Sequence, residues 1–167
     1  NKVEITSTDV AGNTATTYLT FKGATVIELW LEKTDFVVNG ENMPSLATAP
    51  TIKSPPLPKV FAGTTFMPIA DVAKALGVEV KWDQKTKMVT LTQTLENGTK
   101  KVIQLWINKK QAKIDGKDVW IDAKKVLYPT ILSGKTLLPL RFVGDALGAL
   151  VEYDTKTKKI TLTYPKP

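Results

Sequence analysis

The stretch GKTLLPLRFVGDALGALVEYDTKTKKITLT, residues 134–163, decides the fold, because an earlier copy precedes it. That copy is GTTFMPIADVAKALGVEVKWDQKTKMVTLT, residues 63–92, and 15 of the 30 aligned positions are identical. A self-match of this quality indicates a duplicated building module. It carries no chemistry by itself, so function has to be sought in how the copies differ.

Each copy predicts a short helix followed by an antiparallel hairpin. Pro68 and Pro139 suit the first turn of a helix, whose amides lack intrahelical partners. Gly77 and Gly148 follow the apolar helical pattern and suit a left-handed C-terminal cap. Apolar residues then alternate with polar ones, as expected of strands, around turns that begin with an aspartate. We therefore assign structural roles to these two prolines and two glycines.

A looser repeat lies upstream, where residues 26–31 resemble 102–107 and residues 38–41 resemble 114–117. Its offset is 76 residues, against 71 for the helical block, so the first copy has five extra residues. They fall between Gly40 and Gly63, where prolines 50, 55, 56 and 58 predict an extended loop. Asn97-Gly98 is a strong hairpin signal, so we expect one strand pair to join the copies.

These patterns predict an α+β protein: an antiparallel β-sheet curled around short helices, with two pseudo-repeats and an N-terminal β-hairpin. We divide the chain into residues 1–22 (the hairpin), 23–95 (first repeat) and 96–167 (second repeat). A repeat of roughly 70 residues is marginal as an independent core, so we expect the two to pack as one unit. Because the chain begins with Asn1, we expect a processed or excised fragment.

The composition argues against an enzyme. Cysteine and histidine are absent, which removes thiol chemistry, histidine triads and nearly every transition-metal site. No catalytic acid pair or phosphate loop is recognisable, so we expect neither a catalytic residue nor a cofactor nor a bound metal. Asp115 and Asp154 could suggest calcium, but lone turn carboxylates are commoner than calcium sites. No apolar run reaches the ~20 residues of a membrane span.

The net positive charge of the chain comes from its second part. Residues 1–100 are neutral overall, whereas residues 101–167 carry the whole net charge of +7. Such asymmetry indicates an anionic partner, although a lysine face that keeps edge strands apart is the competing interpretation. With Arg141 as the single arginine, we do not expect nucleic acid. The candidate ligand-binding residues are Lys109, Lys110, Lys113, Lys117, Trp120, Lys124 and Lys125.

The four tryptophans could stack on sugars or fill the core. Trp30 and Trp106 occupy equivalent strand positions, and Trp82 corresponds to Tyr153. Since core packing produces such repeated placement, we predict that these three tryptophans are core residues. Trp120 has no aromatic counterpart, so both interpretations stay open for it.

Residues 1–22 form a strand, an Asp9-Val10-Ala11-Gly12-Asn13 turn and a second strand. The segment resembles the closing hairpin of bacterial immunoglobulin-like surface repeats, of which only this tail is present. A lone hairpin is marginal in water. We therefore expect it to pack on its own module or to pair with another molecule, which would permit self-association.

Residues 24–164 resemble the copper amine oxidase N-terminal-like, or stalk, domain. The residues that carry the resemblance are Val38-Asn39-Gly40, Ile114-Asp115-Gly116, the segment 134–148 and Val151-Glu152-Tyr153-Asp154. The first copy departs from this pattern, with Ala70 where the second has Arg141. The resemblance implies a non-catalytic module common in secreted and cell-surface bacterial proteins. It does not imply copper, because the oxidase's metal site and modified tyrosine belong to another domain.

Two hypotheses for the function follow. The chain is a structural or assembly module of an extracellular protein, of the kind found in S-layers or cell walls. Alternatively, it binds a cell-wall polymer or polysaccharide through the basic second repeat.

Overall fold

A computed structural model describes residues 2–20, 23–44, 64–132 and 134–165. The helices are α1 (Ile69–Ala75) and α2 (Leu140–Leu147). The strands of the first half are β1 (Lys2–Thr8), β2 (Thr14–Thr20), β3 (Thr25–Trp30), β4 (Phe36–Val38), β5 (Glu41–Asn42), β6 (Phe66–Pro68), β7 (Glu79–Asp83) and β8 (Met88–Thr94). Those of the second half are β9 (Lys100–Trp106), β10 (Gln111–Ile114), β11 (Lys117–Trp120), β12 (Thr130–Leu132), β13 (Lys135–Pro139), β14 (Leu150–Asp154) and β15 (Lys159–Tyr164).

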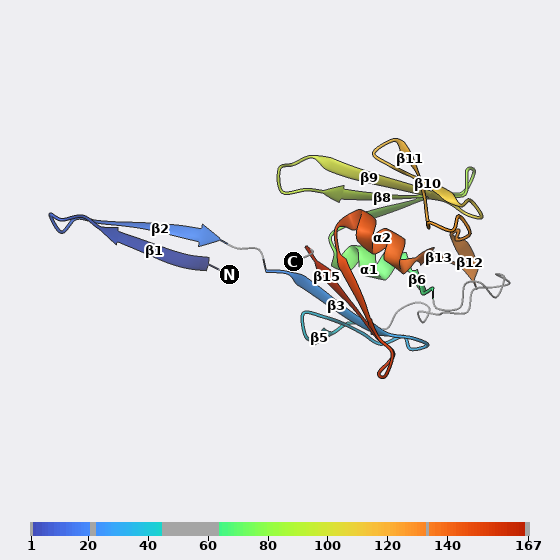
Figure 1. Cartoon of the computed structure of the whole chain (residues 1–167), viewed down its shortest axis with the longest axis horizontal. Helices are drawn as coiled ribbons and strands as arrows, with labels where there is room; N and C mark the ends of the chain where they lie inside the picture. Colours follow the sequence, from blue (N-terminus) through green and yellow to red (C-terminus); the bar gives the residue numbers. More distant parts are fainter. Residues whose placement is uncertain (1, 21–22, 45–63, 133, 166–167) are drawn as a thin grey trace.

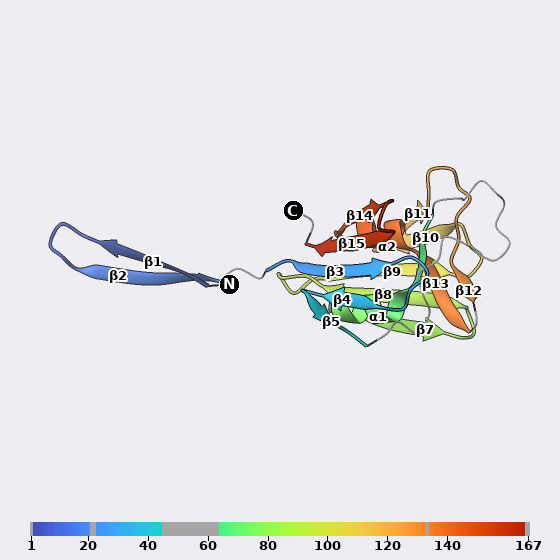
Figure 2. The ribbon, with the colours of Figure 1, turned by 90° about the horizontal axis from the view of Figure 1, so that it is seen from below.

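Two five-stranded antiparallel sheets lie on either side of the two helices (Figure 1). Their strand orders are β11-β10-β9-β8-β7 and β14-β15-β3-β4-β5. A three-stranded sheet, β12-β13-β6, lies at one end of this arrangement, as both views show (Figure 2). Antiparallel sheets with two short helices confirm the α+β prediction.

Each five-stranded sheet takes strands from both halves of the chain. In one sheet Leu91 of β8 pairs with Ile103 of β9, and in the other Leu162 of β15 pairs with Ile27 of β3. Lys159 and Glu28 reinforce the second junction with an ion pair of 2.8 Å, which raises the pKa of the lysine. The halves therefore cannot separate without breaking both sheets.

The predicted hairpin at Asn97-Gly98 is confirmed and joins β8 to β9. The backbone N–H of Leu95 donates to the Thr99 carbonyl at 2.8 Å, and Gly98 has a φ of +78°. The Asn97 side-chain oxygen accepts bonds from both the N–H and the hydroxyl of Thr99. The turn thus fixes the register of the first junction between the halves.

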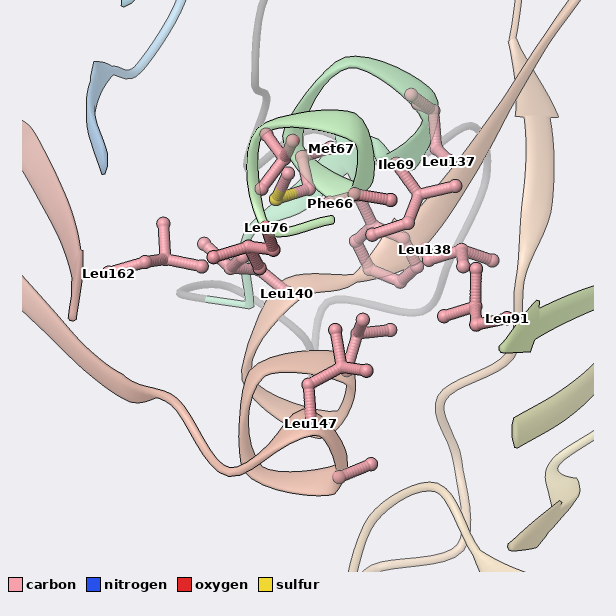
Figure 3. Close-up of a cluster of buried hydrophobic side chains, with 14 of the residues drawn as sticks. Phe66, Met67, Ile69, Leu76, Leu91, Leu137, Leu138, Leu140, Leu147 and Leu162 are labelled. Atoms are coloured by element: carbon pink, nitrogen blue, oxygen red, sulfur yellow. The ribbon is translucent and has the colours of Figure 1, made fainter. Parts of the chain in front are cut away.

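One continuous hydrophobic cluster connects the helices to both sheets. Figure 3 shows its centre, where Leu140 and Leu147 of α2, Leu76 beside α1 and Leu91 of β8 converge. Met67 of β6 pairs with Leu138 of β13 within it, and both side chains are fully buried. Burial of this size supplies the main stabilisation of the fold.

The glycine caps are confirmed, whereas the helix starts differ by one residue from the prediction. Gly77 has a φ of +68° and Gly148 a φ of +77°. Pro68 and Pro139, however, are extended and end strands β6 and β13, so the helices begin at the next residue. The pairing of β6 with β13 holds both prolines in the strand conformation.

The two predicted aspartate turns are confirmed with the same geometry. Asp83 accepts bonds from the Lys85 N–H at 2.8 Å and the Thr86 hydroxyl at 2.8 Å. Asp154 accepts the equivalent bonds from Lys156 and Thr157 at the same distances. In both turns the threonine hydroxyl is the main cause that lowers the pKa of the aspartate.

The N-terminal hairpin forms a two-stranded sheet of its own and projects away from the sheets and helices (Figures 1 and 2). Asp9 closes its turn by accepting bonds from the N–H groups of Ala11 and Asn13 at 2.9 Å. Residues 4–17 are all exposed. Residues 4–17 therefore do not pack on the sheets and helices, and the alternative expectation, pairing with another molecule, stays a prediction. The proline-rich stretch predicted as an extended loop lies within residues 45–63, outside the described residues.

Candidate binding surface

The outer face of the sheet formed by β11, β10 and β9 carries two tryptophans. On β9, Ile103 and Leu105 are fully buried and point towards the core. Trp106 therefore belongs to the opposite, outward row. On β11, Trp120 pairs with Gln111 of β10 and is 44% exposed. Both tryptophans thus lie on one face, with β10 between their strands.

Trp106 and Trp120 line a shallow hollow of about 560 Å³. The remaining lining residues are Asn108, Lys109, Lys110, Gln111, Ala112 and Asp118. The structure therefore brings together three of the predicted ligand-binding residues, namely Lys109, Lys110 and Trp120. It adds Trp106, which the sequence interpretation had assigned to the core.

Two further predicted lysines lie around this hollow. The ammonium of Lys125 is 4.6 Å from the centre of the Trp120 ring, a cation–π distance. Lys113 forms a 3.0 Å ion pair with Asp118, the one acid in the described lining. Because Lys113 neutralises Asp118, the residues that line the hollow carry a net positive charge from Lys109 and Lys110.

The other two predicted lysines lie elsewhere. Lys117 pairs with Ile114, whose neighbour on β9 is the buried Ile103, so Lys117 belongs to the inward row at an exposed edge. Lys124 lines a separate cleft of about 980 Å³ beside α2, together with Lys101 and Arg141. The seven predicted residues therefore do not form a single site.

A tight turn after β11 positions Lys124 and Lys125. The Asp122 carboxylate accepts bonds from the backbone N–H groups of Lys124 (3.0 Å), Val126 (2.8 Å) and Leu127 (2.7 Å). The Asp122 carbonyl also accepts from the Lys125 N–H at 3.0 Å. Asp122 thus fixes the residue that covers Trp120, a role that no sequence motif indicated.

The core prediction for the other tryptophans is wrong in part. Trp82 is 40% exposed and donates its indole N–H to the Gln84 side chain at 2.8 Å. Trp30, like Trp106, is only half-buried, because it shares its strand face with Glu28 rather than with Ile27 and Leu29. The strict alternation on β3 and β9 was the sequence signal that could have placed both tryptophans outward.

The equivalent surface of the first half has the same backbone but a different charge. Positive φ occurs at Glu32 and at its counterpart Asn108, and again at Asn39 and Asp115. The side chains of Asn39 and Asp115 accept matching 2.8 Å bonds from Val26 and Val102, respectively. Positions Glu32, Lys33, Thr34 and Asp35 correspond to Asn108, Lys109, Lys110 and Gln111. Two acids of the first half are thus replaced by amides and one threonine by a lysine, while Lys109 has a lysine as its counterpart.

Neither a metal cluster nor a membrane helix is present in the described part of the chain. Within those residues, no three acidic side chains lie close enough together to hold a metal ion. In the same residues, no helix has the length and apolar character needed to cross a bilayer.

Comparison with known proteins gives one match. The family model described as the copper amine oxidase N-terminal domain matches residues 51–162, about two thirds of the chain. No curated protein and no solved structure shows a significant match. The matched family is the N-terminal, non-catalytic domain of these oxidases and not their catalytic domain.

Proposed function

Because the chain belongs to the family of the copper amine oxidase N-terminal domain, we propose that it is a structural module of a secreted or cell-surface bacterial protein. The supporting observation is the family match together with a core shared by all three larger sheets. A single core that spans both halves resists local opening, which suits a module that transmits load or spaces other domains.

The two halves, in this proposal, are copies of one stalk-like module that exchange strands about an approximate two-fold axis. Two observations support this relation. Leu91 and Leu162 are equivalent in the repeat and have equivalent cross-strand partners, Ile103 and Ile27. In the three-stranded sheet, the middle residue pair between β6 and β13 is Met67 with Leu138, which are equivalent in the repeat. The sheets are then curled around two related helices.

Assembly is proposed to use the N-terminal hairpin and the sheet edges. Among the described residues, strands β5, β7, β11 and β14 end their sheets, and β1 and β2 pair only with each other. Such strands offer unpaired backbone groups to another molecule. The hairpin is proposed to be the end of an immunoglobulin-like domain. Sedimentation of the full chain over a concentration range tests self-association, and a strictly monomeric chain contradicts it.

The non-catalytic assignment has a direct test. Purified protein is incubated with amines, with and without added copper, and peroxide release is measured against an authentic amine oxidase. We expect no turnover in either condition. Stoichiometric copper binding in calorimetry followed by peroxide release contradicts the assignment.

A second candidate function is binding of an anionic cell-wall polymer through the second half. The supporting observation is that Lys109 and Lys110 line one hollow with two outward tryptophans, while the equivalent first-half positions 32–35 are Glu, Lys, Thr and Asp and carry no net positive charge. A pull-down with purified wall at low and high salt tests it, because exposed charges are screened over about 8–10 Å near physiological ionic strength. We expect retention at low salt and release at high salt. Replacement of Lys109, Lys110 and Lys113 by glutamine should weaken retention at unchanged folding.

A further inference from the structure

We propose that the hollow between Trp106 and Trp120 binds an acidic sugar ring of a polysaccharide. In this proposal one or both indoles stack on the sugar, and Lys109 and Lys110, which line the hollow, hold its carboxylate. The inference rests on the polymer-binding function proposed above and specifies the ligand class and the residues that recognise it. It makes Trp106 a ligand-binding residue.

The sheet geometry places the two indoles at a spacing that suits a sugar. Trp120 and Trp106 are on strands β11 and β9, which flank β10, and adjacent strands are about 4.8 Å apart, so the two backbones are separated by ~10 Å. Gln111, on the strand between them, pairs with Trp120. The hollow is therefore flanked by two aromatic side chains, with an amide on the strand between them. Sugar rings have apolar C–H faces and polar hydroxyl edges, which match this pattern.

Backbone hydrogen bonds hold the ends of the hollow. The Lys109 N–H donates to the Trp106 carbonyl at 3.1 Å, and the Ile121 N–H donates to the Lys110 carbonyl at 3.0 Å. The Asn108 N–H donates to the Pro129 carbonyl at 2.9 Å. A surface whose backbone is fixed in this way loses little conformational freedom on binding.

The charges around the hollow favour an acidic sugar over a neutral one. Asp118 is already paired with Lys113, whereas no ion pair among the described residues involves Lys109 or Lys110. The ammonium of Lys125 lies over one face of the Trp120 ring, 4.6 Å from its centre, so a sugar can stack only on the opposite face of Trp120 or on Trp106. The amides of Asn108 and Gln111 can bind hydroxyl groups, which a plain polyphosphate lacks.

The experiment uses the full chain and three probes: polygalacturonate, an acidic sugar polymer; dextran, a neutral one; and polyphosphate, an anion without rings. Binding is measured by calorimetry at low salt. The variants are Trp106→Ala, Trp120→Ala and the conservative Trp120→Phe. Trp30→Ala is the matched control, because Trp30 occupies the same strand position in the other half and is also half-buried. Thermal melting checks that each variant is folded.

We expect polygalacturonate to bind more tightly than dextran or polyphosphate. Each alanine variant at the hollow should lose affinity by about tenfold, the effect of one aromatic contact, while Trp120→Phe loses less and Trp30→Ala loses none. Equal binding of polyphosphate, or an equal loss in Trp30→Ala, overturns the inference. The chain with Lys109, Lys110 and Lys113 all replaced by glutamine is titrated alongside. If that variant loses binding but the tryptophan variants do not, the sugar site is refuted and polymer binding by charge stands. If neither set has an effect, both proposals fail.

Discussion

The presence of strands from both halves in each five-stranded sheet makes a quantitative prediction about unfolding. Leu91 of β8 and Leu162 of β15 are equivalent in the repeat, are 0% and 1% exposed, and each pairs with a residue of the opposite half. Leu→Ala at a buried site costs about 2–5 kcal/mol through lost transfer free energy and the remaining cavity. We take about 3 kcal/mol for each. That value lowers the melting temperature by roughly 6–12 °C in a domain of this size.

The assay is denaturant unfolding of the full chain, followed by tryptophan fluorescence and far-ultraviolet circular dichroism. Because both sheets contain strands of both halves, Leu91→Ala and Leu162→Ala should shift one common transition by similar amounts, with the two probes coincident. Ile5→Ala is the control, since Ile5 is 43% exposed on the projecting hairpin and should change the free energy of unfolding by less than about 0.5 kcal/mol. Two separate transitions, with each variant shifting only one, refute the reasoning.

Three further predictions concern the caps, pH and the hairpin. Gly148→Val should lower the free energy of unfolding by about 1–2 kcal/mol, because the residue has a φ of +77°, which valine adopts only with strain. An added Cβ meets no atom within 4 Å, so the cost comes from the backbone alone. An unchanged denaturation midpoint excludes a left-handed cap. The pKa of Asp154 lies below 3.8 in the folded chain, so the stability it contributes is present above that value and is lost as the pH falls through the folded pKa. Melting from neutral pH to about pH 2 should therefore show a shallower acid decline in Asp154→Asn, and an identical decline contradicts the role of that turn. Deletion of residues 1–22 should leave the melting temperature within about 2 °C, because residues 4–17 are exposed and pack on nothing in the sheets and helices; a clear loss of thermal stability contradicts the projecting hairpin.

The local elements were predictable because their signals lie within a few residues of each other. The apolar spacing that ends at Gly148 predicts α2, and Asp154 predicts the turn that follows β14. The sequence predicts Pro139 in the first turn of α2, whereas it is the last residue of β13, which pairs with β6 some 70 residues earlier. The local sequence pattern does not indicate such long-range pairing.

The pairing of strands between the halves could be predicted for one junction only. Asn97-Gly98 predicts that β8 and β9 pair, since the loop between them is short. Nothing in the sequence near β3 or β15 indicates that Ile27 lies beside Leu162, more than 130 residues later. Identical local signals in two copies cannot specify which copy supplies the neighbouring strand.

The candidate site was predicted in part. Lysine enrichment identified Lys109 and Lys110, and the lack of an aromatic counterpart singled out Trp120. Trp106 was missed because equivalence with Trp30 was interpreted as core packing, although each alternates with fully buried residues. The Lys125 contact depends on the turn that Asp122 organises, and that turn became apparent only from the structure.

The four tryptophans allow one direct test of the claim that the outer face of the second half is a binding surface. Each indole N–H gives a separate resonance in a ¹⁵N-correlated spectrum of the full chain. On titration with polygalacturonate we predict shifts for Trp106 and Trp120, and unchanged positions for Trp30 and Trp82. Shifts at Trp30 or Trp82 with Trp106 and Trp120 unmoved, or no shift at any of the four, contradict the account.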